Sequence, residues 1–251
     1  MARRTRQMLL DPSIRFQPDL AVEALNARYE GAPPQDVLHA ALRFYAGGIA
    51  VVSSFGAESA VLLHMVSEIN PHTPVLLIDT EMLFPQTIAY QEELTAWLGL
   101  TDVRRIRQDR AELKQRDPYG ALHLSNPDAC CTMRKVEPLE RALQHFTASI
   151  SGRKRFQAGT RVAMPLFEQE RGGRIKVNPL AEWSPKEIAA YMVAHDLPRH
   201  PLVAEGYPSI GCMPCTSKVG EGEDARAGRW RGQDKIECGI HFTPEGARRA
   251  S

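Results

Sequence analysis

Short apolar runs alternate with longer amphipathic stretches along the first 200 residues of the chain. Four runs predict buried strands: GIAVVSS (48–54), TPVLLIDT (73–80), TDVRRI (101–106) and RFQAGT (155–160). Four stretches with apolar residues at helical spacing predict helices: 60–69, 85–100, 133–146 and 184–195. This alternation favours an α/β fold, in which a mostly parallel sheet carries helices on both faces.

The punctuation of the chain supports these helices. Residues 18–46 predict two more helices, which GAPP at 31–34 interrupts. Pro85 stands at the start of one helix and Gly99 near its end, and Ser184 and Pro185 are suited to the N-cap and first position of another. The helix over 133–146 is expected to begin just after a pair of cysteines.

The periodic pattern is lost after about residue 200. The remaining stretch is rich in glycine and charge, yet it carries three of the five cysteines. Such a segment is expected to be ordered by a metal or by a substrate. We therefore divide the chain into an α/β domain, residues 1–210 with its N-terminal helices in 1–46, and a cysteine-bearing C-terminal segment, residues 211–251.

Charge and composition exclude several classes of protein. The 31 Lys and Arg residues balance 30 Asp and Glu residues, so nothing suggests a nucleic-acid or anionic-membrane partner. The N-terminal MARRTRQMLL lacks the apolar region of a secretory signal, and no run is long enough to span a membrane. A cytoplasmic location is expected. Stable disulfides are uncommon there, and clustered cysteines more often bind metals or take part in catalysis.

The first predicted strand runs into a small-residue turn and then a helix, in VVSSFGAESAVLL. This arrangement directs backbone N–H groups and the positive end of a helix at an anion, and Ser53, Ser54 and Ser59 around Gly56 add hydroxyl groups. The loop is neither a Walker A motif nor a dinucleotide fingerprint. It predicts a phosphate site, with an ordinary strand-to-helix turn as the alternative.

Four cysteines form two pairs, Cys130–Cys131 and Cys212-x-x-Cys215. A C-x-x-C pair alone suits a redox dithiol, half of a zinc site or half of an iron–sulfur site. The adjacent pair offers two sulfurs from one helix, which favours a cluster of several metal atoms. We interpret the four as ligands of a 4Fe-4S cluster, with structural zinc, a disulfide or unconnected thiols as alternatives.

Several cations lie beside these elements. Lys135 follows the adjacent cysteines, Arg161 follows a predicted strand, and Arg226, Arg229 and Arg231 stand in DARAGRWRG. Guanidinium groups are well suited to phosphate or sulfate, although most surface arginines are merely solvated. The fifth cysteine, Cys238, lies near Lys235 and His241 and is either a reactive thiol or an idle one. His195 and His200 are expected to be surface or capping residues.

Six stretches in order resemble the assimilatory adenylyl-sulfate and phosphoadenylyl-sulfate reductases. They are SSFGAESAVLLHMV, IDTEMLFPQT, CCTMRKVEPL, GCMPCT, EGEDARAGRW and KIECGIH. The resemblance covers about residues 45 to 242, and the cysteine pairs resemble the iron–sulfur branch of this family. Two positions depart from the usual pattern. Ser59 stands where that branch often has Asp, and Glu81 where the family often has Gly.

The resemblance implies an adenine-nucleotide α-hydrolase-like fold and the reduction of adenylyl sulfate to sulfite and AMP. Cys238 would be the nucleophile that becomes S-sulfonated, and thioredoxin or a similar dithiol would release sulfite. Cys130, Cys131, Cys212 and Cys215 would hold the 4Fe-4S cluster. The loop at 53–59 would bind the nucleotide. Lys135, Arg161, Arg226 and Arg229 would bind its phosphosulfate, with His241 nearby. Family members are often oligomeric, which favours a homo-oligomer.

Three alternatives remain at this point. Phosphoadenylyl sulfate is the second candidate substrate. An ATP-dependent adenylylating or sulfur-transfer enzyme would use a similar loop and release pyrophosphate. A non-enzymatic metal or redox sensor would account for the paired cysteines but not for KIECGIH or the glycine loop.

Overall fold

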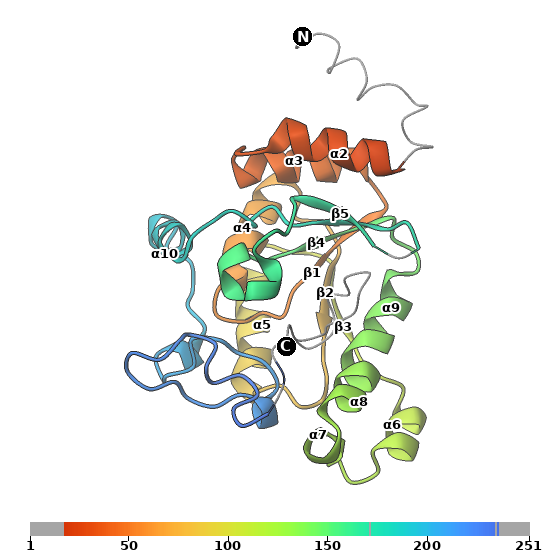
Figure 1. Cartoon of the computed structure of the whole chain (residues 1–251), viewed down its shortest axis with the longest axis vertical. Helices are drawn as coiled ribbons and strands as arrows, with labels where there is room; N and C mark the ends of the chain where they lie inside the picture. The colour runs from red at the N-terminus through yellow and green to blue at the C-terminus, as the bar shows by residue number, and fades with distance from the viewer. Residues whose placement is uncertain (1–17, 171, 234, 236–251) are drawn as a thin grey trace.

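The computed structural model describes residues 18–170, 172–233 and 235. Its centre is a six-stranded sheet in the order β3-β2-β1-β4-β6-β5 (Figure 1). The strands are β1 (Ile49–Val52), β2 (Val75–Ile78), β3 (Val103–Ile106), β4 (Ala148–Ser151), β5 (Phe167–Gln169) and β6 (Ile175–Val177). All neighbours pair in parallel except β5, which runs antiparallel to β6 at one edge. The mostly parallel α/β sheet predicted from the sequence is confirmed.

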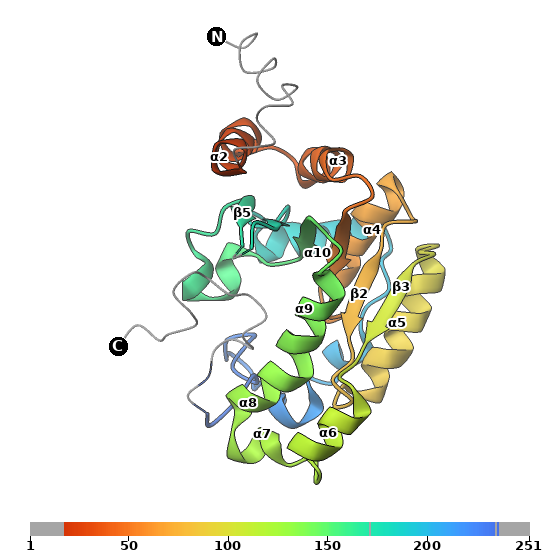
Figure 2. The ribbon, with the colours of Figure 1, turned by 90° about the vertical axis from the view of Figure 1, so that its right-hand side faces the viewer.

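Helices cover both faces of the sheet. The larger core packs α3 (Pro34–Phe44), α4 (Ser59–Ile69), α5 (Pro85–Trp97) and α10 (Pro185–Ala194) against one face. On the other face, α9 (Glu137–Leu143) packs on Ala50, Leu76 and Ile78 (Figure 2). The remaining α-helices are α2 (Pro18–Tyr29), α6 (Arg110–Arg116), α7 (Leu122–Ser125) and α8 (Pro127–Cys131). No helix among the described residues has the length and apolar character to cross a membrane.

Local signals in the sequence set the ends of the helices. Ser184 caps α10 and forms a reciprocal capping box with Glu187, and Pro185 takes the first position, as predicted. Leu98 caps the C-terminus of α5, and the next residue is Gly99. Gly99 has φ +63°, the left-handed conformation that often ends a helix.

The predicted strand at 155–160 is wrong. Two short 3₁₀ turns, Arg155–Gln157 and Gly159–Arg161, occupy this stretch, and the strand is the preceding β4. In β4, Ser149 and Ser151 are buried beside Ile150, so the strand lacks an apolar run that would identify it. The three-residue strands β5 and β6 were also not predicted, since segments this short carry little periodicity.

The helix of the adjacent cysteines also begins earlier than predicted. Pro127 opens α8, the side chain of Asn126 accepts a hydrogen bond from the backbone of Ala129, and both cysteines lie in the last turn. A π-helical turn, Thr132–Val136, then leads into α9. Pro138 has no N–H for the helical ladder, and the wider turn before it relieves the clash of its ring with the preceding turn.

Candidate active site

The principal pocket lies at the carboxyl ends of the central strands. Strands β1, β2 and β3 extend to one side of the sheet and β4 and β6 to the other, so the strand order reverses between β1 and β4. Ligands of open α/β sheets bind at such a reversal. The residues following β1 and β4 line a cavity of about 280 Å³ here. The topology therefore places the site where strands diverge and leave room for a ligand.

The loop after β1 forms one wall of this pocket. Ser53, Ser54, Gly56 and Ser59 all line it. The loop is tightly folded, because the Ser53 hydroxyl accepts a hydrogen bond from the Phe55 N–H and the Ser59 hydroxyl accepts one from the Gly56 N–H. Each hydroxyl keeps its own proton to donate to a ligand. The N-terminus of α4 follows directly and adds its partial positive charge.

Phe55 fixes the shape of this loop. Its side chain is fully buried in the core, yet its backbone has φ +48°, a conformation that bulky residues rarely adopt. Burial of the ring outweighs this strain and holds the backbone in a turn that it would otherwise avoid. Such strain is characteristic of binding loops, and here it orients the backbone beside Ser54 and Gly56.

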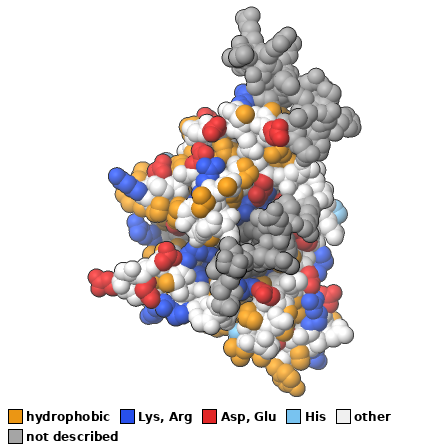
Figure 3. Space-filling model, in the orientation of Figure 1, with side chains coloured by type: hydrophobic (Ala, Val, Ile, Leu, Met, Phe, Trp, Pro, Cys, Tyr) orange, Lys and Arg blue, Asp and Glu red, His pale blue; other side chains and the backbone are white. Residues whose placement is uncertain are grey.

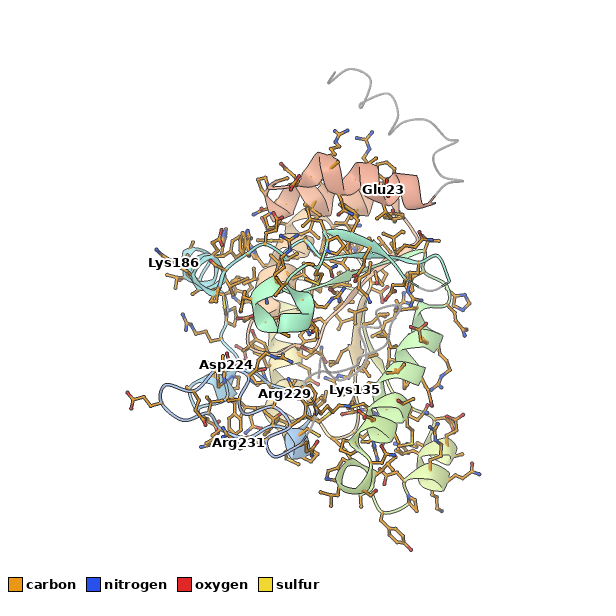
Figure 4. The ribbon with its side chains drawn as sticks, in the orientation of Figure 1. Glu23, Lys135, Lys186, Asp224, Arg229 and Arg231 are labelled. Atoms are coloured by element: carbon orange, nitrogen blue, oxygen red, sulfur yellow. The ribbon has the colours of Figure 1, made fainter. Side chains whose placement is uncertain are left out.

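Cations from three other segments line the same pocket. Lys135 comes from the π-helical turn, Arg161 from the second 3₁₀ turn, and Arg226 and Arg229 from the C-terminal loop, residues 207–233. Lys135 and Arg161 are both largely buried. In Figure 4, the Lys135 and Arg229 side chains lie in the same region although they belong to segments far apart in the sequence. Figure 3 shows Lys and Arg side chains gathered over the C-terminal loop, with Asp and Glu side chains among them.

An internal hydrogen-bond chain links the first loop to Arg161. Lys154 is almost fully buried and forms an ion pair with Glu58 at 2.6 Å. Gln157 donates to the same Glu58 oxygen and accepts a hydrogen bond from Arg161 at 2.7 Å. Burial lowers the pKa of Lys154, and Glu58 opposes that change. Sequence reasoning missed Lys154 and Glu58. The basic run GRKR after β4 was the available signal.

The C-terminal loop is attached to the sheet by backbone contacts. Leu83, after β2, pairs with Cys212 as an isolated bridge, and the Met213 N–H donates to the Met82 carbonyl. Thr216 and Arg229 form a second bridge within the loop. These contacts bring Cys212 and Arg229 to the pocket without any long helix or strand.

A second, small cavity of about 10 Å³ lies between α7, α8 and the C-terminal loop, and shares Lys135 and Cys212 with the main pocket. Both cysteine pairs line it, together with Thr80, Arg134 and Lys135. None of these four described thiols is in a disulfide, and three of them are buried. Among the residues that the structure describes, no group of three or more His, Cys, Asp or Glu side chains is arranged to hold a metal ion. The donor set nevertheless fits a thiolate-ligated group, because four thiols face one enclosed space.

The charges around these thiols differ. Burial raises the pKa of Cys130 to about 11. Burial acts in the same direction on Cys212, but Lys135, the Thr80 hydroxyl and Arg229 outweigh it, so the pKa of Cys212 lies below its ordinary value. The Thr80 hydroxyl lies 3.2 Å from the Cys212 sulfur. Lys135 thus faces both the cysteines and the main pocket, since it lines each of the two cavities.

Not every predicted site residue can be located. Cys238 and His241 lie outside the described residues, so their roles stay predictions. Arg231 forms an ion pair with exposed Glu223 and does not line the pocket. His200 is buried, and its ring accepts a hydrogen bond from the Leu202 N–H, so it is a capping residue as predicted but not a surface one. His195 is exposed at the end of α10.

Known structures first identify the fold. The FMN adenylyltransferase of Candida glabrata, solved with FMN and an ATP analogue, matches 76% of this chain and 68% of its own with a TM-score of 0.55 and 16% identity. A phosphoadenylyl-sulfate reductase of Candida auris, in a phosphate complex, matches 79% of this chain and 96% of its own with a TM-score of 0.67 and 29% identity. The fold is thus adenine-nucleotide α-hydrolase-like.

The sequence comparisons then give the family. Residues 48–218 match the family described as phosphoadenosine phosphosulfate reductase domain. An adenosine 5'-phosphosulfate reductase of Mesorhizobium japonicum is 51% identical over 87% of this chain and 86% of its own. A phosphoadenosine 5'-phosphosulfate reductase of Gloeobacter violaceus is 40% identical over 88% of this chain and 93% of its own. The chain belongs to the adenylyl-sulfate and phosphoadenylyl-sulfate reductase family.

Proposed function

We propose that this protein reduces adenylyl sulfate to sulfite and AMP, with electrons from thioredoxin or a similar dithiol, in assimilatory sulfate reduction. The observation that carries the proposal is the main pocket. It unites a strand-to-helix loop suited to phosphate with Lys135, Arg161, Arg226 and Arg229, beside two cysteine pairs. The 51% identity to an enzyme named adenosine 5'-phosphosulfate reductase supports this choice of substrate.

Binding and leaving-group stabilisation fall to the lining residues. Ser53, Ser54, Gly56 and Ser59 would hold the nucleotide through hydroxyl and backbone donors. The four cations would pair with the phosphosulfate, as arginine forks do with phosphate and sulfate. When AMP departs, negative charge grows on its phosphate, and fixed cations in a partly enclosed pocket stabilise that charge. His241 is assigned a place near the phosphosulfate.

The chemistry is assigned to Cys238. Its thiolate attacks the sulfate sulfur, an S–S bond forms, and the bond from sulfur to the phosphate oxygen breaks, so AMP leaves with the electron pair. One thiolate of the donor dithiol then attacks the Cys238 sulfur, and sulfite leaves with the pair of the broken S–S bond. The second donor thiol resolves the mixed disulfide. Cys238 is restored as a thiol and the donor is oxidised to a disulfide.

We assign Cys130, Cys131, Cys212 and Cys215 as ligands of one 4Fe-4S cluster. Four thiols that line one small cavity, with no disulfide among them, support this assignment. When bound, the cluster would supply a fixed group beside the substrate and no electrons for it. Lys135 would orient the anion next to the cysteines, because it lines both cavities and hydrogen-bonds Cys212.

The remaining assignments follow from this chemistry. The reducing cytoplasm, where thioredoxin acts, is the location we propose, because clustered cysteines there more often bind metals or take part in catalysis. We retain the division into an α/β domain, residues 1–210, and a C-terminal segment, residues 211–251, that brings Cys238 to the pocket. A homo-oligomer is the assembly we propose, with no nucleic acid or membrane partner.

Phosphoadenylyl sulfate is the second candidate substrate, because relatives from Gloeobacter violaceus and Candida auris are named for it. The extra 3'-phosphate would need a further cation. Two cations on the pocket wall, Lys154 and Arg153, already form ion pairs with Glu58 and Glu168. This pairing favours the substrate with the smaller charge.

The test is intact mass under non-reducing conditions. Anaerobically purified protein is mixed with adenylyl sulfate in the absence of thioredoxin, in wild-type and Cys238→Ser forms. The expected result is a sulfonate adduct and released AMP with the wild type alone.

Parallel samples with phosphoadenylyl sulfate rank the two substrates by the rate of adduct formation. An adduct-free wild type that retains its iron contradicts the mechanism. Release of pyrophosphate from ATP by the same sample would instead indicate an adenylylating enzyme.

A further inference from the structure

Arg229 differs from other cations of the pocket wall in how it is held. Lys154 and Arg153 are ion-paired with carboxylates. Among the described residues, Arg229 donates from Nη1 to the backbone carbonyl of Ile210 at 3.2 Å, and its Cζ lies 4.5 Å from the centroid of the Trp230 ring. Its charge also acts on the thiols of Cys212 and Cys215. Its Nε is buried without a hydrogen-bond partner. No carboxylate of the described residues therefore forms an ion pair with this guanidinium.

The first side of the Arg229 site is the bare backbone of Gly211. A Cβ atom at this position would lie 2.3 Å from Nη2 and 2.5 Å from Cζ of Arg229. Real Cβ contacts are never this short, so any other residue at 211 would displace the guanidinium. Gly211 does not have a positive φ, which makes the requirement one of space and not of backbone conformation.

The second side is the indole of Trp230, which is almost fully buried. The backbone of Trp230 has φ +50°, and its N–H donates to the carbonyl of Cys215 at 3.0 Å. A cation over an indole face is attracted by the ring without losing its charge. Gly211 and Trp230 thus enclose Arg229 from the two ends of the segment that carries Cys212 and Cys215, and all three residues line the pocket.

We propose that Gly211 and Trp230 are positioning residues, which hold the Arg229 guanidinium in a fixed position, away from the carboxylates of the described residues, for the anionic group of the nucleotide. This inference rests on the proposed function for the identity of the nucleotide, but not for the anion. Gly211 and Trp230 both belong to the C-terminal loop, which also carries Cys212 and Cys215. The order of that loop therefore determines the affinity of the Arg229 site for the anion. The coupling is mechanical and does not require a change of charge at the cysteines.

The test measures binding in the Cys238→Ser background, so that adenylyl sulfate is not consumed. Isothermal calorimetry gives the affinities for adenylyl sulfate and AMP, and each variant is matched to a control. Gly211→Ala is expected to weaken binding roughly tenfold or more, whereas Gly220→Ala, where a Cβ meets only ordinary contacts, changes nothing. Trp230→Leu is expected to lower the affinity roughly tenfold. Trp230→Phe keeps an aromatic face and is expected to lower the affinity less than about threefold.

A double-mutant cycle separates positioning from general damage. In an Arg229→Ala background, Gly211→Ala and Trp230→Leu are expected to cause no further loss, because they act through the missing guanidinium. Additive losses in the cycle overturn the proposal, and so does full affinity in Gly211→Ala. Iron content and thermal midpoint are measured for each protein. If Gly211→Ala loses iron, the comparison of Trp230→Leu with Trp230→Phe takes its place.

The same cycle with AMP distinguishes failure of the proposed reaction from failure of the positioning role. If wild-type protein forms no sulfonate adduct but the cycle is non-additive for AMP, the proposed reaction fails and the positioning role stands. If the adduct forms and the cycle is additive, the reaction stands and the positioning role fails.

Discussion

Single backbone conformations define much of the site. Glu81, directly after Asp79 and Thr80 at the end of β2, has φ +58°, and its N–H donates to the Asp79 side chain at 3.0 Å. This left-handed conformation favours glycine. The sequence showed Glu81 only as a departure from a family pattern. The structure shows that the residue retains the conformation of a glycine at some cost.

This cost leads to a prediction for residue 81. Glu81→Gly is expected to be more stable than Glu81→Ala by about 1 kcal/mol, because alanine keeps the strain and glycine relieves it. Thermal unfolding of the two variants with equal iron content measures the difference. Equal midpoints would mean that the backbone at this position is not strained.

At the level of single residues, the sequence predicted which residues share the site only where they follow one another in a recognisable local motif. Ser53, Gly56 and Ser59 follow a strand and precede a helix, and this order predicts their pocket. Gly211 and Trp230 carried no such signal. The importance of Gly211 lies in its close approach to Arg229, 18 residues away along the chain, and a single sequence does not contain that distance.

At the scale of elements, His200 joins α5 to the turn Pro201–Val203. Its Nδ1 accepts a hydrogen bond from the Leu202 N–H, so Nε2 carries the proton and faces the Thr87 hydroxyl at 3.0 Å. The ring also contacts Tyr90, with centroids 4.8 Å apart. Protonation of Nδ1 would break the bond to Leu202. Burial accordingly lowers the pKa of His200 from 6.5 to about 4.

This shift predicts a pH dependence of stability. Between pH 6.5 and about 4 the unfolded chain binds a proton at His200 and the folded chain does not, so acid favours unfolding in this window. The loss reaches about 3 kcal/mol near pH 4 and does not grow below it. His200→Asn keeps an acceptor for the Leu202 N–H but lacks the ring that contacts Tyr90. The variant is therefore expected to be less stable than the wild type at pH 7.

The measurement is urea unfolding at a series of pH values for both proteins. The variant should have the flatter profile between pH 6.5 and 4.5. Parallel profiles would show that other groups cause the acid sensitivity.

The elements were predictable where apolar periodicity was strong, as in α4, β2 and α5. They were not where polar residues are buried. Ser149 and Ser151 concealed β4, and the run after it was taken for the strand. The π-helical turn that carries Lys135 was also hidden, because its cause is the ring of Pro138 two positions beyond its end.

At the scale of the molecule, the C-terminal loop has almost no regular structure and depends on its attachments. Its links are the Leu83–Cys212 and Thr216–Arg229 bridges and the contact of Met213 with Met82. Under the proposed assignment, the metal ligands on α8 and on this loop are joined through the cluster. Removal of the cluster should therefore loosen the loop while the sheet persists.

This dependence can be measured by removing iron. Anaerobic treatment with a chelator, or Cys212→Ser, is expected to lower AMP affinity at least tenfold and to increase proteolysis within residues 207–233, with little change in far-UV circular dichroism. Cys238→Ser should retain iron and acid-labile sulfide in equal amounts. Unchanged affinity after iron loss would show that the loop is ordered by protein contacts alone.

The pocket is assembled from pieces that leave the ribosome at very different times. The last strand of the sheet ends at Val177, but the pocket wall is complete only when Arg229 and Trp230 are present. A nascent chain can thus build its sheet and its phosphate loop while it still lacks a cation that we assign to the anion. Synthesis passes through a long interval in which the scaffold exists without its complete pocket wall. Nucleotide capture, and under the proposed assignment the insertion of the cluster, therefore come late in synthesis.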